Sequence, residues 1–175
     1  MDSSDFIEFL KSRSSVRFYQ GNSLTEEEIE YILTCAGTAP SAGNLESWDV
    51  IIITEAGVLA ALAEAAFGQP HVQQAGTIFV VCANYVRSMS RYGERGILYG
   101  LEDATIACTY MMLAAHAKNL HSCWTGAFQD DEVREILDLP QHIRPVALLA
   151  VGRGQPPEEK AVKRNPLEHV HREIW

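Results

Sequence analysis

The sequence predicts an α+β fold in which helices cover a small central sheet, mixed or antiparallel. Helical and strand-like patterns alternate along the chain, the strand-like ones are few, and several connections between them are long. The chain has 175 residues, of which 47% are hydrophobic and 21% charged, an ordinary composition for a globular domain. We therefore expect residues 1–175 to form a single domain whose core needs neither a disulfide nor a metal.

The first half of the chain carries the first helices and strands. Ser4 or Asp5 can cap an opening helix whose apolar face holds Phe6, Phe9 and Leu10. A capping box of Thr25 and Glu28 starts a second helix, with apolar residues at Ile29, Ile32, Leu33 and Ala36. Apolar runs then predict strands over 48–54 and 77–84, separated by an Ala/Leu-rich helix over 55–67.

The second half begins with the longest predicted helix, over 100–119. Its apolar residues cover more than one stripe, which indicates burial on more than one side, and Asn119 suits a left-handed stop. A short strand over 122–127 follows. Asp130 is placed to cap a further helix, which ends before Pro140, and 145–151 reads as a last strand.

The composition changes over 152–175. This segment is rich in proline and charge, has little apolar surface until its end, and finishes on an amphipathic stretch that closes with Trp175. It cannot form a core of its own. We expect an extended arm that docks elsewhere, on another subunit.

Charge and cysteine usage exclude several classes of protein. The net charge of −9 argues against nucleic acid as the main partner but leaves room for a small phosphate site. Cys35, Cys82, Cys108 and Cys123 form no CxxC pair and are expected to be reduced, buried thiols. The acidic start does not resemble a signal peptide, and no apolar run is long enough to span a membrane, so we expect a cytoplasmic protein.

Three short segments could contact a ligand. Arg13, Ser14, Ser15 and Arg17 place two guanidinium groups and two hydroxyls together, a set that can hold a phosphate; the alternative is a solvated turn. The loop over 40–44 consists of small and hydrogen-bonding residues that let a flat ligand approach the backbone, unless it is an ordinary connector. Small residues over 125–127 follow a predicted strand and can expose backbone N–H groups.

Other catalytic signatures are missing. The sequence has no GxSxG or HExxH motif, and neither GxGxxG nor GxxxxGK[ST] is present. The six histidines are scattered, and the pair His169 and His171 has no visible partners for a metal. We therefore expect no metal site and no side-chain nucleophile.

Six motifs in order resemble those of the nitroreductase family of FMN-dependent oxidoreductases. They are the R-x-S-x-R pattern at 13–17, the APS-x-x-N-x-x-x-W pattern at 39–48, the Gly-Gln pair at 68–69, a long central helix, the CW-x-G-x-F pattern at 123–128, and R-x-P-L-E-x-V at 164–170. Each motif is short, but their order and spacing match over nearly the whole chain.

The resemblance implies a homodimer with FMN bound at the subunit interface and a domain-swapped C-terminal tail. It assigns the FMN phosphate to Arg13, Ser14, Ser15, Arg17 and, from the tail, Arg164. It places Pro40, Ser41, Ala42 and Asn44 over the flavin of the partner subunit, and Gln69 at the ribityl or pyrimidine edge. It aims the backbone of Thr125, Gly126 and Ala127 at flavin N5 and O4, with Gly126 nearest N5.

Three features depart from the family pattern or extend it. Family members often have a Lys near flavin N1 and O2, where this chain has Val72 or Gln73. The tail Lys two residues before the Arg is replaced by Val162, with Lys163 adjacent. The polar segment 87–99 resembles an insert and is a candidate lid or pocket wall that selects the substrate.

The activity implied by the resemblance is a ping-pong cycle in one shared pocket. NAD(P)H would reduce the flavin, and a small acceptor such as a nitroaromatic or quinone would then be reduced. No catalytic side chain is expected, because the flavin performs the redox step. The alternatives are a flavin-binding regulatory or storage module, a reductive dehalogenase-like member of the same fold, and a thiol-based redox protein, which the dispersed cysteines disfavour.

Overall fold

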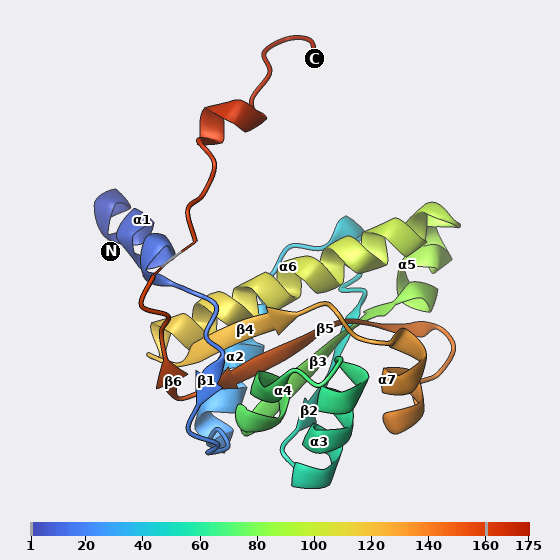
Figure 1. The fold of residues 1–175 in the computed structure, drawn as a ribbon. Coiled ribbons are helices and arrows are strands. Elements are labelled where there is room, and N and C mark those ends of the chain that lie inside the picture. Colours follow the sequence, from blue (N-terminus) through green and yellow to red (C-terminus); the bar gives the residue numbers. More distant parts are fainter. Residues whose placement is uncertain (1, 160) are drawn as a thin grey trace.

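Four strands form a central antiparallel sheet in the order β2-β3-β5-β4 in this computed structural model, which describes residues 2–159 and 161–175 (Figure 1). The strands are β2 (Trp48–Ile53), β3 (Thr77–Asn84), β4 (His121–Thr125) and β5 (Ile143–Gly152). All three neighbouring pairs are antiparallel. The antiparallel form of the prediction is therefore confirmed, and a mixed arrangement is wrong for these four strands.

Helices cover both faces of this sheet (Figure 1). One face packs against α2 (Glu26–Ala36) and α6 (Arg95–Ala117), and the other against α3 (Ala56–Ala65), α4 (Pro70–Gln74) and α7 (Asp130–Ile136). Phe79 and Val81 of β3 belong to the first core, whereas the alternate residues Ile78 and Val80 belong to the second. Strand side chains alternate between faces, so a central strand covered on both sides is apolar throughout.

The two helices between β3 and β4 differ from the boundaries that the sequence predicts. The long helix α6 begins at Arg95 rather than at 100, and α5 (Tyr85–Tyr92) together with the first residues of α6 occupies most of the segment expected to resemble an insert. A Cβ atom on Gly96 would lie 2.5 Å from the Met89 amide nitrogen, so this glycine lets α5 and α6 pack at very short range. Glycines that suggest a loop in the sequence here serve helix packing.

Several caps also differ by a few residues. Asp2, not Ser4 or Asp5, caps α1 (Ser3–Ser12), and Asp5 completes its capping box. Gln129 precedes α7, and Asp130 is the first residue inside that helix. The short helix α4, which opens on Pro70, was not expected from the sequence. The capping box of α2 and the positive φ of Asn119 (57°) are confirmed.

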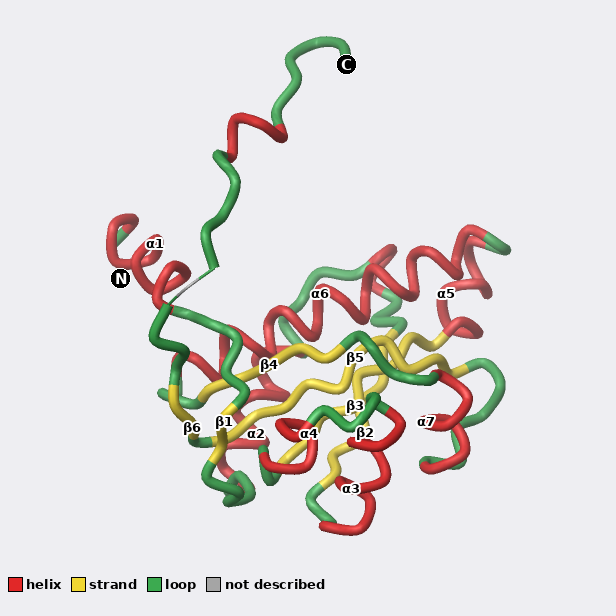
Figure 2. The backbone as a smooth tube through the Cα atoms, in the orientation of Figure 1, coloured by secondary structure: helices red, strands yellow, loops and turns green. Residues whose placement is uncertain are grey.

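Two peripheral segments project from the layered core. Strands β1 (Phe18–Tyr19) and β6 (Gly154–Gln155) form a small antiparallel ribbon, after which the chain leaves the core as an extended tail with one turn of 3₁₀ helix, η2 (Pro166–His169) (Figure 2). The helix α1 has no buried residue. Side chains of the described tail residues after β6 are exposed, and residue 160 of the predicted arm lies outside the described residues.

Candidate functional site

The arginine and serine cluster lies along the free edge of β4. Ser15 forms a parallel bridge with Ser122, and the amide of Val16 donates to the Ser122 carbonyl at 3.0 Å. Val16 is fully buried, so its neighbours Ser15 and Arg17 direct their side chains the opposite way, toward the outside. This local extended pairing brings the polar residues of the cluster to one side of the chain.

A pocket of about 550 Å³ opens beside this cluster. Its cationic lining comes from Lys11, Arg13, Arg17 and Lys163, and its remaining lining residues are Leu10, Ser14, Ser15, Pro157, Glu159 and Ala161. The tail takes part because the β1–β6 ribbon starts the tail beside residues 13–17. Four cations against one carboxylate give the lining of the pocket a net positive charge.

The end of β4, the strand that Ser15 pairs with, presents backbone N–H groups. Thr125 is buried, whereas Gly126 and Ala127 are exposed, and within the described residues their amides donate to no acceptor. Gln69 donates through Nε2 to the carbonyls of Ala66 (2.9 Å) and Ala127 (3.0 Å), which places it beside this turn. An exposed pair of unused amides is suited to a ligand with polar ring atoms.

A buried histidine connects the two parts of this edge. The Nε2 atom of His71 lies 2.7 Å from Oγ1 of Thr125 in a buried hydrogen bond. Burial lowers the pKa of His71, and the positive charge of Arg17 lowers it further. The His71–Thr125 hydrogen bond thus joins α4 to the end of β4, and the charge of Arg17 acts on the histidine of this pair.

The loop over 40–44 lies at the opposite edge of the sheet. It contains the 3₁₀ turn η1 (Ala42–Asn44) and leads into β2, which is the edge strand farthest from β4. Gly43, Asn44 and Glu46 have positive φ values of 58°, 57° and 49°, a backbone that needs support from its surroundings.

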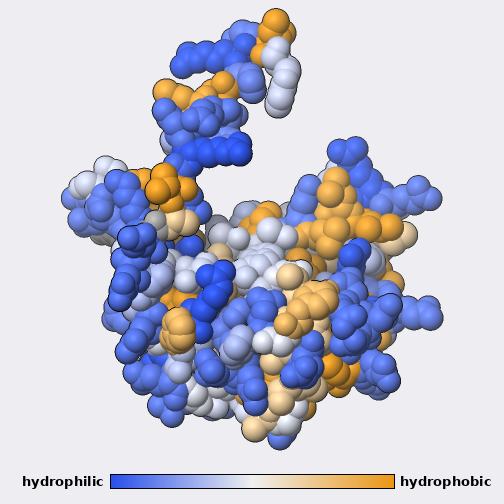
Figure 3. Space-filling view, viewed as in Figure 1, coloured by the Kyte–Doolittle hydropathy of each residue, from blue (hydrophilic) through white to orange (hydrophobic). Residues whose placement is uncertain are grey.

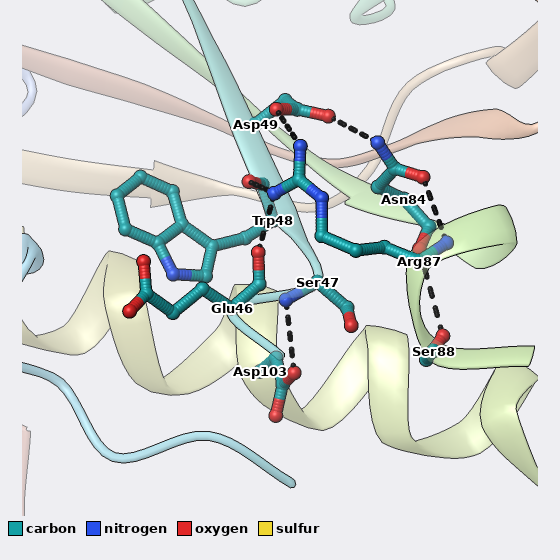
Figure 4. Close-up of polar contacts among 8 residues, drawn as sticks. All are labelled: Glu46, Ser47, Trp48, Asp49, Asn84, Arg87, Ser88 and Asp103. Atoms are coloured by element: carbon teal, nitrogen blue, oxygen red, sulfur yellow. Dashed lines mark hydrogen bonds and ion pairs between the residues drawn. The ribbon is translucent and has the colours of Figure 1, made fainter. Parts of the chain in front are cut away.

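Two charged side chains provide that support (Figure 4). Asp103 of α6 is 1% exposed and accepts hydrogen bonds from the amides of Ala42 (2.8 Å) and Ser47 (3.0 Å). Arg87 of α5 donates to the carbonyls of Glu46 and Trp48 and pairs with Asp49 at 3.0 Å. The helical hairpin α5–α6 therefore fixes the shape of the whole turn.

The structure thus divides the predicted residues into three groups. Arg13, Ser14, Ser15, Arg17, Gln69, Thr125, Gly126 and Ala127 lie along the β4 edge, while Pro40, Ser41, Ala42 and Asn44 lie at the β2 edge. Arg164 is exposed in the tail and does not line the pocket, which Lys163 does.

Three residues at or near these sites, Lys11, Asp103 and His71, have a weak signal in the sequence or none. Lys11 lines the pocket, and its only signal is a position two residues before Arg13. Asp103 shares the helical spacing of the small buried residues Gly100 and Ala107, three before and four after it, which is a usable signal for a buried hydrogen-bonded charge. His71 has no sequence signal that separates it from the other histidines.

The cysteines do not form a redox centre in the described residues. Cys35, Cys82, Cys108 and Cys123 are all free thiols. Burial raises the pKa of Cys82 to about 12 and also raises the pKa of Cys108 and Cys123, which suppresses the reactive thiolate. No helix in the described part of the chain is long and apolar enough to cross a membrane.

Comparison with known proteins assigns the family. The model of the family described as "Nitroreductase family" matches residues 10–75 and 63–153. A protein of Archaeoglobus fulgidus named "Putative NADH dehydrogenase/NAD(P)H nitroreductase" is 32% identical over 97% of this chain and 98% of its own length. The chain belongs to the nitroreductase family. It is an oxidoreductase of the NAD(P)H nitroreductase and FMN reductase type.

Further relatives of this nitroreductase family member agree. The "FMN reductase (NADPH)" of Bacillus subtilis is 29% identical over 83% of this chain, which spans only 64% of that longer protein. The solved structure of B. megaterium NfrA1 superposes with a TM-score of 0.91 at 25% identity, covering 98% of this chain and 75% of the other. The predicted nitroreductase-like α+β fold is therefore confirmed.

Proposed function

We propose that this chain is an FMN-dependent NAD(P)H oxidoreductase that binds FMN along the outer edge of β4. The proposal depends on one observation: a cationic pocket and two backbone amides without acceptors both belong to the β4 edge of the sheet. From Ser122 to Gly126 the strand extends roughly 13 Å. An elongated ligand with a phosphate at one end and a flat polar ring at the other fits this spacing of complementary groups.

The residues of the β4 edge have separate parts in this proposal. Arg13, Arg17 and the hydroxyls of Ser14 and Ser15 would hold the phosphate, with Lys163 or Arg164 added from the tail. The amides of Gly126 and Ala127 would donate to the ring near N5 and O4, while Gln69 and the His71–Thr125 hydrogen bond keep this turn in place. When bound, FMN supplies the hydride and electron transfer, from NAD(P)H to a small acceptor in two half-reactions.

The proposal includes a homodimer in which the tail and the loop over 40–44 act on the partner subunit. The tail exposes Leu167, Ile174 and Trp175 to 74%, 82% and 98%, and α1 exposes Phe6 and Ile7 to 47% and 46%. Figure 3 shows apolar side chains on these projections. Apolar side chains so exposed are stabilised by burial against another surface. Within one chain the loop over 40–44 lies at the edge opposite β4. A second subunit would bring its own 40–44 loop to the β4 edge of the first.

The proposal is tested by the colour of the purified protein and by its affinity for FMN. We expect yellow protein with the absorbance of bound FMN, which NAD(P)H bleaches under anaerobic conditions. The Arg17→Ala variant should bind FMN about 10- to 100-fold more weakly, the loss expected for one charge-assisted hydrogen bond.

Arg144→Ala is the matched control for this titration, because Arg144 is an exposed arginine that pairs with Asp130. Its dissociation constant for FMN should equal that of the unmodified protein. Colourless protein that takes up no FMN would contradict the proposed function, and unchanged affinity in Arg17→Ala would contradict the phosphate role of that residue.

A further inference from the structure

A second group of cations lies on the α5–α6 hairpin. Arg91 is near the end of α5 and Arg95 opens α6, with the sharp turn at Gly93 between them. The Arg91 guanidinium carbon is 5.6 Å from the ring centre of Tyr92, and that of Arg95 is 5.5 Å from the ring centre of Tyr99. Arg95 also donates through Nε to the Tyr99 hydroxyl at 2.7 Å.

The two tyrosine rings join these arginines into one cluster. Tyr92 and Tyr99 pack edge to face, with ring centres 4.8 Å apart and an interplanar angle of 83°. Each guanidinium is thus held at a ring rather than moving freely, which lowers the entropy lost when it binds a ligand. We call Arg91, Tyr92, Arg95 and Tyr99 the hairpin cluster.

Neither arginine of the hairpin cluster has a carboxylate partner in the described part of the chain. Other arginines of this acidic protein do form ion pairs: Arg87 with Asp49 (3.0 Å), Arg144 with Asp130 (3.1 Å) and Arg153 with Glu28 (2.6 Å). Glu94 lies between Arg91 and Arg95 in sequence but makes no ion pair with either in the described residues. The Nη2 atom of Arg91 and both Nη atoms of Arg95 make no hydrogen bond or ion pair within the described residues, so they remain available to an anion.

The hairpin cluster touches the loop that the proposed function places over the flavin. Arg91 donates through Nη1 to the Gly43 carbonyl at 3.3 Å. The Tyr92 hydroxyl occupies the space where a side chain at Gly43 would stand, and the Arg91 Nη1 atom lies 2.9 Å from that position. A molecule that binds under this loop is consequently within reach of a long arginine side chain.

We propose that Arg91 and Arg95 form an anion subsite that binds the carboxylate or phosphate group of a co-substrate entering the flavin pocket. This inference rests on the proposed function, because it takes the loop over 40–44 to cover the flavin. Two sources of the anion share this chemistry: the 2′-phosphate of NADPH and the carboxylate of an aromatic acceptor. The tyrosine rings add an apolar surface beside the charged groups, which suits an aromatic anion.

The test compares matched anionic and neutral ligands on the FMN-loaded full chain. Dissociation constants are measured from the change in flavin absorbance for NADP⁺ against NAD⁺, and for 4-nitrobenzoate against 4-nitrobenzamide. KM and kcat are measured for NADPH against NADH with a neutral quinone as acceptor. The variants are R91Q/R95Q, R91K/R95K and, as the control, Arg144→Gln.

We expect R91Q/R95Q to reduce the preference for the anionic member of one pair by about tenfold or more, mainly through Kd and KM. R91K/R95K should restore part of that preference, because lysine keeps the charge but not the planar fork. Arg144→Gln should keep it. A change in the dinucleotide pair identifies the 2′-phosphate, and a change in the nitroaromatic pair identifies the acceptor carboxylate.

If R91Q/R95Q keeps its preference for the anionic member of both pairs within twofold of that of the unmodified chain, the inference is overturned and the proposed function stands. Failure of the unmodified chain to bind FMN would overturn both. If R91Q/R95Q loses its circular dichroism spectrum, Arg95→Gln alone decides. Arg95 is exposed at the start of a helix, and in the described residues its side chain makes one hydrogen bond, to the half-buried Tyr99.

Discussion

Asp103 is a fully buried carboxylate whose two oxygens each accept one backbone hydrogen bond, from Ala42 and Ser47. A carboxylate accepts hydrogen bonds without donating any, so it suits a turn that directs two N–H groups to one point. The Ser47 hydroxyl is buried nearby without a hydrogen-bond partner in the described residues. Asp103 is therefore the main polar support of this turn from α6.

We predict that Asp103→Ala lowers the free energy of unfolding by about 2–4 kcal/mol, because two buried amides lose their acceptors. Urea denaturation followed by circular dichroism measures the change. Glu102→Ala, an exposed neighbour on the same helix, should alter stability by no more than about 0.5 kcal/mol. Equal effects of the two substitutions would mean that the turn does not depend on Asp103.

His71 makes stability depend on pH. Burial and the charge of Arg17 lower its pKa below the ordinary value of 6.5. Between that lowered pKa and 6.5 the unfolded chain binds more protons than the folded one, so the stability conferred by His71 is full above 6.5 and falls as the pH drops. Below the lowered pKa both states are protonated and the loss stops growing.

The prediction is that His71→Gln loses less stability than the unmodified chain when the pH falls from neutral to mildly acidic. Unfolding curves at a series of pH values measure the difference. His142→Gln, which changes an exposed histidine, should follow the unmodified chain. If the curves of His71→Gln and the unmodified chain stay parallel, His71 does not carry this pH dependence.

At the scale of elements, the close contact of α5 with α6 depends on Gly96. A Cβ atom there would lie 2.5–2.7 Å from backbone atoms of Ser88 and Met89, which cannot move without shifting the helix. Because Arg87, Arg91 and Asp103 all reach the 40–47 turn from this hairpin, its packing also fixes the turn.

Gly96→Ala should therefore destabilise the protein by about 1–3 kcal/mol, although alanine is the better helix former. Gly37→Ala is the control: Gly37 ends α2 with φ −63°, and its nearest Cβ contact would be an ordinary 3.5 Å. That substitution should be neutral or stabilising by up to about 1 kcal/mol. The melting temperatures of both variants are compared by thermal denaturation. A melting temperature of Gly96→Ala at or above that of Gly37→Ala would refute the close packing of α5 on α6.

Much of this architecture is predictable from the sequence, for identifiable reasons. The run over 78–83 is apolar at every position because β3 is covered on both faces, and the capping box at Thr25 is a local signal. The start of α6 was not predictable, because Gly96 and Gly100 lower helix propensity locally and their packing partner lies on another helix. Local patterns do not encode such tertiary contacts.

In the candidate site, too, local clusters are predictable from the sequence and tertiary contacts are not. Arg13, Ser15 and Arg17 stand together in the sequence, so their cluster could be predicted. The hydrogen bond of His71 to Thr125 joins residues 54 apart in sequence, and no pattern in either segment indicates it. Family resemblance supplies roles for the residues but not the contacts that hold them.

At the scale of the whole molecule, the order β2-β3-β5-β4 sets the 40–44 loop and the arginine cluster at opposite edges of one sheet. In the proposed two-fold dimer each site combines the arginine cluster of one subunit with the loop of the other. Under this proposal the sheet separates, within each chain, the two halves of a site by its full width.

In the proposed dimer, that separation makes a defect in the arginine cluster and a defect in the loop complementary. A chain with Arg13→Ala and Arg17→Ala damages only the cluster, and a chain with Asp103→Ala loosens only the loop. In a mixed dimer both defects fall on the same site, and the other site is built from two sound halves. Co-expression in equal amounts should restore about a quarter of the unmodified activity, since half of the dimers are mixed. Activity no higher than the mean of the two separate variants would place both halves of each site in one chain.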